Sequence, residues 1–137
     1  MKRRKRIMKK KVFTSVAVMA AITSAMVATA MAEDYKVGIV QYVDDASLNQ
    51  ITENIEKELD AKGEELGVTF NYADYFSNAQ ADSSVLNQIS TDLLADQVDV
   101  IVAIATPVAM VMQSATEDTD IPVIFSAVSD PVGAGLV

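Results

Sequence analysis

Thr106 and Pro107 directly follow a strongly apolar segment at residues 98–105. A Thr-Pro pair is typical of a helix start, with Thr at the N-cap and Pro at the first helical position. The free backbone N–H groups of such a start favour a carboxylate or a phosphate. The pair therefore predicts a contact with an anionic ligand group, although it is also compatible with an ordinary helix start.

A second polar cluster, Ser126, Ser129 and Asp130, lies at the end of the apolar segment at residues 123–128 and just after it. Hydroxyl groups can hydrogen-bond a polar ligand, and a lone carboxylate suits an ammonium group. The Asp-Pro sequence at this point is also common in turns. We therefore predict ligand contacts for these three residues, with a turn as the alternative for Asp130.

Four further candidate ligand contacts follow the first two predicted strands. Gln41 and Tyr42 lie at the polar end of a strand at residues 35–43, and Asn78 and Gln80 lie in a polar loop predicted at residues 77–82. Tyr42 has the alternative of packing over the first helix rather than stacking on an aromatic ligand. Asn78 and Gln80 have the alternative of capping loops and helices.

The chain contains no Cys and no His. Thiol nucleophiles, imidazole bases, Ser-His-Asp triads and Cys/His zinc sites are therefore excluded. The remaining serines and carboxylates form no constellation with a base oriented toward a nucleophile. We expect no catalytic residue, no metal site and no cofactor, and we interpret the protein as a binding protein rather than an enzyme.

Apolar strands alternate with amphipathic helices along the chain. Strands are predicted at residues 35–43, 68–75, 98–105 and 123–128. One helix has apolar residues at three- and four-residue spacing from 48 to 59 and can end at Gly67; further helices begin near residue 82 and at Thr106. This alternation predicts the α/β class, with a doubly wound parallel sheet in strand order 2-1-3-4. All nine candidate contacts then lie at one edge of the sheet.

The first 32 residues have the pattern of an export signal. Eight of the eleven Lys and Arg residues fall between residues 2 and 11, an uncharged apolar run follows, and residues 30–32 read Ala-Met-Ala. This order predicts a signal peptide cleaved after Ala32. The alternative is an uncleaved membrane anchor, since residues 12–32 are just long enough to cross a bilayer.

Residues 33–137 carry three lysines against all nineteen acidic residues, a formal net charge of −16. Such a charge repels nucleic acid and anionic membranes. Their length suits one small core and is too short for two ordinary domains. We expect neither nucleic acid nor a membrane as a partner of the mature chain.

Several segments resemble the substrate-binding proteins of ABC transporters. The resemblance covers nearly all of residues 35–137, and the last of its segments is the most specific. The segments are residues 36–41 (KVGIVQ), 78–80 (NAQ), 86–89 (LNQI), 104–107 (IATP) and 125–137 (FSAVSDPVGAGLV).

The resemblance implies a periplasmic-binding-protein-like fold with two lobes, some members of which bind aromatic amino acids such as tryptophan or tyrosine. Family members are much longer, so residues 33–137 are expected to be the N-terminal part of lobe 1, in a truncated sequence. An ABC permease is the implied partner. Two departures stand out: a lipobox Cys is missing, and Tyr75, Phe76 and Ser77 extend the segment after the second strand.

The sequence therefore predicts the extracytoplasmic, periplasmic or extracellular, solute-binding component of an ABC import system, which captures a small ligand. A ligand-sensing ectodomain of a membrane-anchored receptor is the alternative if the first segment is retained. A phosphoacceptor or flavodoxin-type module fits less well. The third strand ends without an Asp, and the only Gly-x-Gly lies at residues 133–135.

If the export signal is cleaved, protein secreted from cells should begin at Glu33 or within a residue or two of it. Intact-mass measurement of the exported protein checks this. A membrane-bound species that retains residues 1–32 would instead support the anchored receptor.

Overall fold

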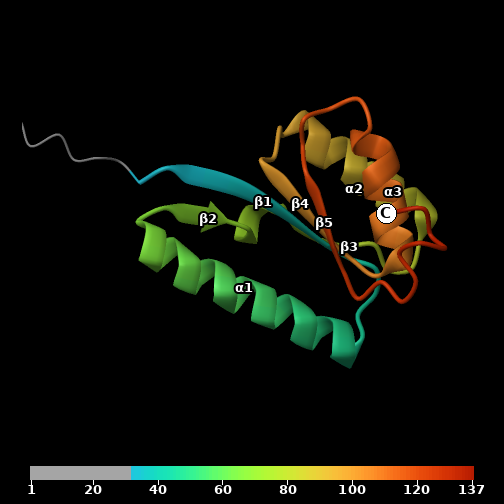
Figure 1. Cartoon of the computed structure of the whole chain (residues 1–137), viewed down its shortest axis with the longest axis horizontal. Helices are drawn as coiled ribbons and strands as arrows, with labels where there is room; N and C mark the ends of the chain where they lie inside the picture. The colour runs from blue at the N-terminus through green and yellow to red at the C-terminus, as the bar shows by residue number, and fades with distance from the viewer. Residues whose placement is uncertain (1–31) are drawn as a thin grey trace, which may run out of the picture. The chain divides into compact units, whose positions relative to one another are not determined.

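The computed structural model describes residues 32–137, which form one α/β unit (Figure 1). The predicted export signal lies, apart from Ala32, outside the described residues. The elements in chain order are β1 (Asp34–Gln41), α1 (Ala46–Leu66), β2 (Thr69–Asn71), the short 3-10 helix η1 (Ala73–Tyr75), β3 (Phe76–Asn78), α2 (Ser83–Ala95), β4 (Val100–Ile104), α3 (Thr106–Thr116) and β5 (Val123–Ser126).

All strand pairs in the sheet are parallel, and the strand order is β2-β1-β4-β5. This order confirms the predicted 2-1-3-4 arrangement. β3 also pairs with β1: β2 lies beside the start of β1, at Asp34 to Lys36, and β3 lies beside its end, at Ile39 to Gln41. In place of the second predicted strand there are therefore two short strands, β2 and β3, which both pair with β1.

The prediction of one continuous strand at residues 68–75 is wrong, as is a loop that begins at residue 77. The side chain of Asn71 accepts from the Asp74 N–H and donates to the Asp74 carboxylate, with lengths of 3.5 and 3.0 Å. Tyr75 N–H then donates to Tyr72 carbonyl at 3.0 Å. Short polar side chains that bond the local backbone compete with strand pairing, and here they impose the turn η1. Pairing resumes at Phe76, so Ser77 and Asn78 lie in β3.

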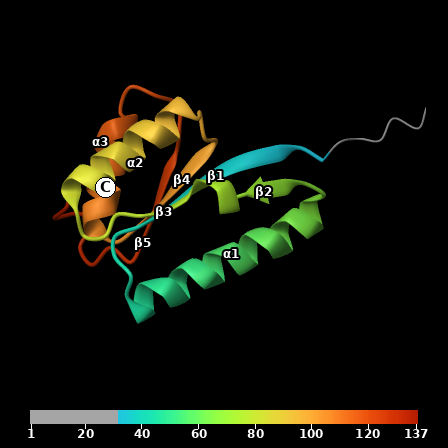
Figure 2. The ribbon, with the colours of Figure 1, turned by 180° about the vertical axis from the view of Figure 1, so that it is seen from behind.

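The helices cover both faces of the sheet, as a doubly wound fold requires. Figure 1 and Figure 2 show α1 on one side of the strands and α2 and α3 on the other. Four buried residues of β1 and β4 form the core beneath α1: Val37, Ile39, Val102 and Ile104. Against them pack the four apolar residues whose spacing predicted the helix: Leu48, Ile51, Ile55 and Leu59. The apolar periodicity of α1 therefore identified its buried face correctly.

The larger core lies on the opposite face, between the sheet and α2 with α3. It includes Val40, Ile101 and Ala103 from the strands, Leu86 and Leu93 from α2, and Val108 and Met112 from α3. Gly38 allows α2 to approach β1 closely, because a Cβ at this position would lie 3.1 Å from both terminal methyl groups of Leu93. Alternate residues of β1 thus contact opposite cores.

The two ends of α1 are fixed by its own flanking residues. Asp45 is the N-cap, and its carboxylate accepts from the N–H groups of Ser47 and Leu48 at 2.8 and 3.3 Å. Gly67 ends the helix with a φ of 69°, a left-handed conformation that favours glycine. The end at Gly67 matches the sequence expectation. Within residues 32–137, no helix is long and apolar enough to cross a membrane.

In the described part of the chain, β5 pairs with β4 on one side only. Ile124 is 57% exposed beside this edge. It also lines an apolar groove of about 570 Å³ between α1 and β5, together with Ile51, Ile55 and Phe125. An exposed strand edge next to apolar side chains is a template for pairing between chains.

We expect residues 33–137, expressed alone, to associate through the β5 edge, and we expect Ile124→Lys to shift the protein toward monomer. A lysine at an edge strand blocks edge-to-edge pairing. Sedimentation velocity over a concentration series measures the effect. Val132→Lys is the matched control, because Val132 is an exposed apolar residue outside the sheet. A monomeric wild type at all concentrations would contradict the prediction.

Candidate functional site

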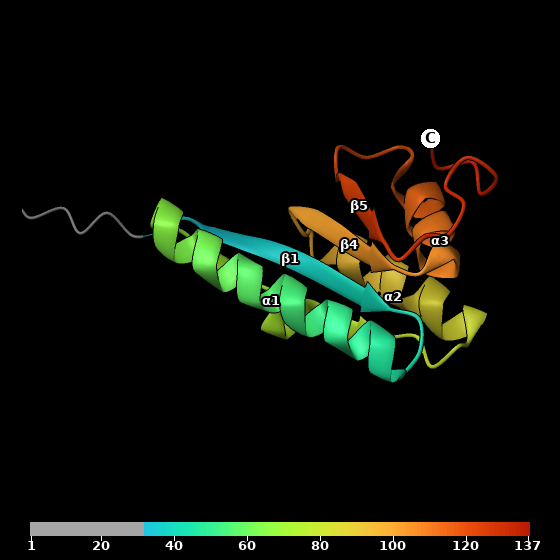
Figure 3. The ribbon, with the colours of Figure 1, turned by 60° about the horizontal axis from the view of Figure 1, so that its bottom comes forward.

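The strand registers align the C-terminal ends of four strands in one row. Gln41 of β1 pairs with Asn78 of β3 and with Ile104 of β4, and Ile104 pairs with Ser126 of β5. Figure 3 shows the arrowheads of β1, β4 and β5 pointing toward the same edge. We call this edge, with the segments that leave it, the rim. The segments that contain the predicted contacts therefore meet at the rim.

Gln41 and Tyr42 turn to opposite faces of the sheet. Gln41 lies on the same face as Val37 and Ile39, and it is buried, with 2% of its surface exposed. Its side-chain amide forms hydrogen bonds with the following loop and with two residues of α1. Tyr42 is half-buried and packs against the core of α2 and α3. Tyr42 therefore packs in the structure, but the expected position over the first helix is wrong: β1 turns it away from α1, to the face covered by α2 and α3.

Asn78 and Gln80 form a tight turn between β3 and α2. The Asn78 side chain accepts from the Gln80 N–H at 2.8 Å, and both Gln80 and Ala81 have positive φ, 53° and 56°. The turn is tied to the neighbouring loop, because Ala81 N–H donates to the Tyr42 carbonyl at 2.8 Å. Asn78 is half-buried and Gln80 is exposed at the rim. The capping alternative describes the role of Asn78 in this turn.

The assignment of Thr106 as N-cap and Pro107 as first helical residue is wrong by one position. Ala105 is the N-cap, Thr106 is the first residue of α3, and no side chain caps the helix. Ala105 has φ 85° and ψ 153°, and its N–H donates to the Ser126 carbonyl at 3.0 Å. The bond to β5 extends the sheet by one residue, so the chain must turn into the helix at Ala105 itself.

The start of α3 nevertheless keeps the property that the sequence predicted. The first N–H groups of a helix have no partner within the helix, and here Pro107 has no N–H and no side chain takes the place of a cap. Thr106 is half-buried and Pro107 is exposed, so this start faces the rim. It can attract an anion through the N–H group of Thr106 and through the helix dipole, whereas Val108 is buried in the core.

Asp130 forms a turn beyond β5. Its carboxylate accepts from the Gly133 N–H at 2.9 Å, and its carbonyl accepts from the Ala134 N–H at 3.0 Å. Ser129 and Asp130 are exposed, whereas Ser126 is half-buried at the end of β5. The turn alternative is therefore observed for Asp130, and its carboxylate remains accessible to solvent.

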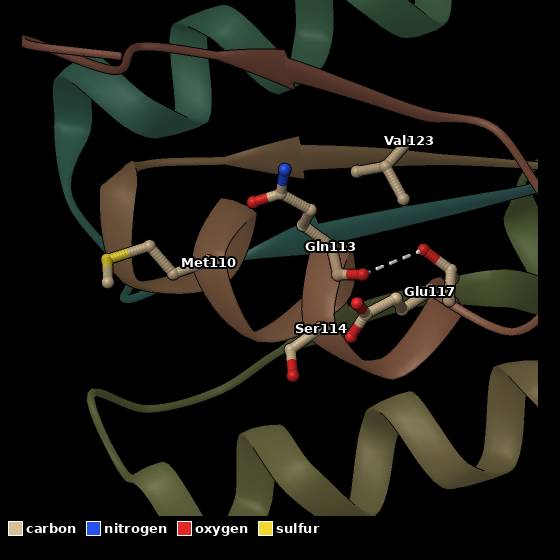
Figure 4. A pocket seen from close by; sticks show the side chains of 6 residues that line it. Met110, Gln113, Ser114, Glu117 and Val123 are labelled. Atoms are coloured by element: carbon tan, nitrogen blue, oxygen red, sulfur yellow. Dashed lines mark hydrogen bonds between the residues drawn. The ribbon is translucent and has the colours of Figure 1, made fainter. Parts of the chain in front are cut away.

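Hollows away from the rim contain little of the predicted site. One of about 560 Å³ is lined by Met110, Gln113, Ser114, Thr116, Glu117 and Val123. Figure 4 shows the labelled side chains along α3, from Met110 to Glu117, and Val123 at the start of β5. Of the nine predicted contacts, the α1–β5 groove contains Ser126. We therefore base the candidate site on the rim rather than on these hollows.

Three side chains of the described residues have a raised pKa, and none is a predicted contact. A hydrogen bond of 2.6 Å to the Glu33 carboxylate raises the pKa of Tyr35. Burial raises the pKa of Tyr72, and its hydrogen bond to Asp60 adds to this. Burial next to Asp60 also raises the pKa of Glu56. Residues 32–137 contain no group of three or more acidic side chains arranged to hold a metal ion.

Sequence reasoning missed two residues that shape the rim. Thr52 lies in α1 and is 6% exposed, and its hydroxyl donates a hydrogen bond to the side-chain oxygen of Gln41. Its position beside Ile51 and Ile55 on the apolar face was the available signal. Ala105 was missed because nothing in its residue type indicates an unusual backbone.

Comparison with known proteins gives a consistent result. A family model described as ABC transporter substrate binding protein matches residues 36–137. A tyrosine-binding protein of Clostridioides difficile (strain R20291) is 41% identical over 101 residues, which make up 74% of this chain and 28% of that protein.

Two solved structures are similar as well. An ABC domain from Streptococcus pneumonia in complex with L-Trp is 37% identical, with a TM-score of 0.61 over 74% of this chain and 32% of that chain. The ligand-free, open structure of a substrate binding protein with adhesive properties from Clostridium difficile is 36% identical, with a TM-score of 0.64 over 75% and 34%. The chain thus spans about a third or less of the length of these relatives.

The backbone of Ala105 generates a test of the rim geometry. A non-glycine residue in this region costs about 1–3 kcal/mol, whereas glycine costs about 0.5–1 kcal/mol more entropy on folding. We therefore expect Ala105→Gly to raise the free energy of unfolding by about 1 kcal/mol, measured by urea denaturation.

Ala103→Gly is the matched control, because Ala103 is buried in β4 and has no positive φ. Ala103→Gly should lower the free energy of unfolding. The substitution removes a buried methyl group, and glycine loses more backbone entropy on folding than alanine does. An equal loss of stability in both variants would show that Ala105 is not strained.

Proposed function

We propose that this chain, which belongs to the family of ABC transporter substrate-binding proteins, forms part of an extracytoplasmic receptor that delivers an amino acid to an ABC permease. The observation that carries this proposal is the rim, where polar segments after β1, β3, β4 and β5 meet at one edge of a parallel sheet. Ligands of open α/β sheets bind at this edge. The role requires binding and release, and no chemistry on the ligand.

The similar proteins support an amino acid as the ligand. One is named for tyrosine and another was solved with L-Trp. The half-buried Tyr42 is the aromatic side chain among the nine predicted contacts, and it lies directly after β1. An aromatic amino acid would have a carboxylate, an ammonium group and a ring to distribute over such a site.

The ligand carboxylate is assigned to the start of α3 in this proposal. The uncapped N–H group of the half-buried Thr106 offers a hydrogen bond, and the helix dipole favours a negative charge there. Residues 33–137 carry a formal net charge of −16, so an anionic group needs a local positive potential of this kind. The start of α3 supplies that potential from backbone alone.

The ligand ammonium group is assigned to Asp130. One carboxylate oxygen holds the turn by accepting from Gly133 N–H, and the group as a whole is exposed. A charge-assisted hydrogen bond to an ammonium is compatible with this turn, because a carboxylate accepts several hydrogen bonds. In the sequence, Ser126 and Ser129 lie between Thr106 and Asp130, the residues assigned to the two ends of the ligand.

Binding by residues 33–137 alone should be weak, with a dissociation constant on the order of millimolar. The chain spans about a third of its relatives, and the family resemblance implies a second lobe that closes over the ligand. A rim without that cover leaves most of the ligand in water. We therefore choose a measurement that detects weak binding residue by residue.

Titration of ¹⁵N-labelled residues 33–137 with L-tryptophan should shift the amide resonances of Thr106 and the segment around Ser129. Asp130→Asn keeps a side-chain acceptor for Gly133 N–H but removes the negative charge. We expect this variant to weaken binding by about tenfold or more, as for a lost charge-assisted hydrogen bond.

Asp118→Asn is the control for that titration, because Asp118 is an exposed carboxylate after the far end of α3. It should leave the dissociation constant unchanged. Shifts confined to residues away from the rim, or equal weakening in both variants, would contradict the proposed site.

A further inference from the structure

The side chain of Gln41 is buried although it was predicted to contact ligand. It is 2% exposed, at the last position of β1, beneath the first turns of α1. A primary amide removed from water must be hydrogen-bonded, because unpaired polar groups are costly in a protein interior. The bonds that Gln41 makes therefore reveal what the residue does.

Both hydrogens of the Gln41 amide are donated within the protein. Nε2 donates to the Val43 carbonyl at 2.7 Å and to Oδ1 of Asn49 at 2.6 Å. The Gln41 Oε1 accepts from the hydroxyl of Thr52, itself buried, at 2.7 Å. One side chain thus connects the end of β1, the loop at residues 42–45 and the first turns of α1.

The network continues from Asn49 to the loop. Nδ2 of Asn49 donates to the Asp44 carboxylate at 2.7 Å, and the Asn49 N–H donates to the Asp45 carbonyl at 2.8 Å. The Asp45 side chain caps α1. Three consecutive loop residues, from Val43 to Asp45, are therefore fixed by bonds that begin at Gln41.

The backbone at the same position holds the next loop of the rim. The carbonyl of Gln41 accepts from the Ala79 N–H at 2.9 Å, and that of Tyr42 accepts from the Ala81 N–H at 2.8 Å. The turn that contains Asn78 and Gln80 is therefore attached to the residues that Gln41 anchors. Movement of the β1–α1 loop would disturb both segments.

We infer that Gln41 is a positioning residue, whose buried amide holds the β1–α1 loop and, through it, the Asn78–Gln80 turn in the arrangement that the rim presents. The residue acts without touching a ligand. Its effect on ligand binding rests on the proposed function, whereas its effect on the loops is independent of any ligand.

Gln41→Met tests the inference, because methionine has a similar shape and cannot make any of the three bonds. Hydrogen exchange by NMR on residues 33–137 should become at least about tenfold faster at the amides of Ser47, Asn49 and Ala81, since an average hydrogen bond changes an opening equilibrium by about that factor. The Asp99 N–H, which bonds the Lys36 carbonyl at the opposite end of β1, should exchange at the wild-type rate.

Thr116→Val is the matched control. Thr116 is 7% exposed and its hydroxyl bonds the Met112 carbonyl, but it lies at the last position of α3, whose first residue is at the rim. Loss of the Thr116 hydroxyl should leave hydrogen exchange at the amides of Ser47, Asn49 and Ala81 unchanged. If Gln41→Met prevents folding, Thr52→Val removes a single bond of the network and should accelerate the same amides to a smaller extent.

A uniform increase in exchange, or none at these amides, would overturn the inference and make Gln41 an ordinary core residue. L-Tryptophan titration gives the second readout: Gln41→Met should weaken binding by about tenfold and Thr116→Val should not. A wild type that does not bind L-tryptophan would count against the proposed ligand, while the exchange pattern would still decide the role of Gln41.

Discussion

The pairing of β1 with both β3 and β4 is the constraint on which the rest of this structure depends. Because all strands are parallel, the chain must return to the same end of the sheet after each strand, and every strand-to-helix connection leaves from the same edge. The register then places Asn78, Gln41, Ile104 and Ser126 in one row. Segments far apart in sequence therefore meet at the rim through the pairing of the strands that precede them.

Successive side chains of β1 point to opposite faces of the sheet, and this alternation explains the outcome of several predictions. Residues 37, 39 and 41 face α1, whereas residues 38, 40 and 42 face α2 and α3. The order of strands followed from the alternation of strands and helices, the apolar face of α1 followed from periodicity, and both were confirmed. The same period of two places the Gln41 amide under α1, so its burial was available from the sequence once parity was considered. Its partner Thr52 required knowledge of the helix register on the sheet.

Other features could not be predicted because they arise from competition between local bonds. Asn71 and Asp74 interrupt the second strand, because the Asn71 side chain bonds both the Asp74 N–H and the Asp74 carboxylate, and a sequence rich in strand formers conceals this. Likewise, the bond from Ala105 N–H to Ser126 extends β4 pairing and moves the helix start by one residue. Thr106 has the residue type of a cap, yet pairing between strands determines where the cap falls.

The rim combines segments that are held in different ways. The β1–α1 loop is fixed by a buried amide and by an N-cap, so opening it would expose polar groups that lose their partners. Residues 127–137 are held by turn bonds around Asp130 and by partial burial of Val128 and Leu136. Exposed turn bonds cost less to break than buried ones, because water replaces them. If the rim adjusts to a ligand, residues 127–137 therefore move while the β1–α1 loop keeps its position.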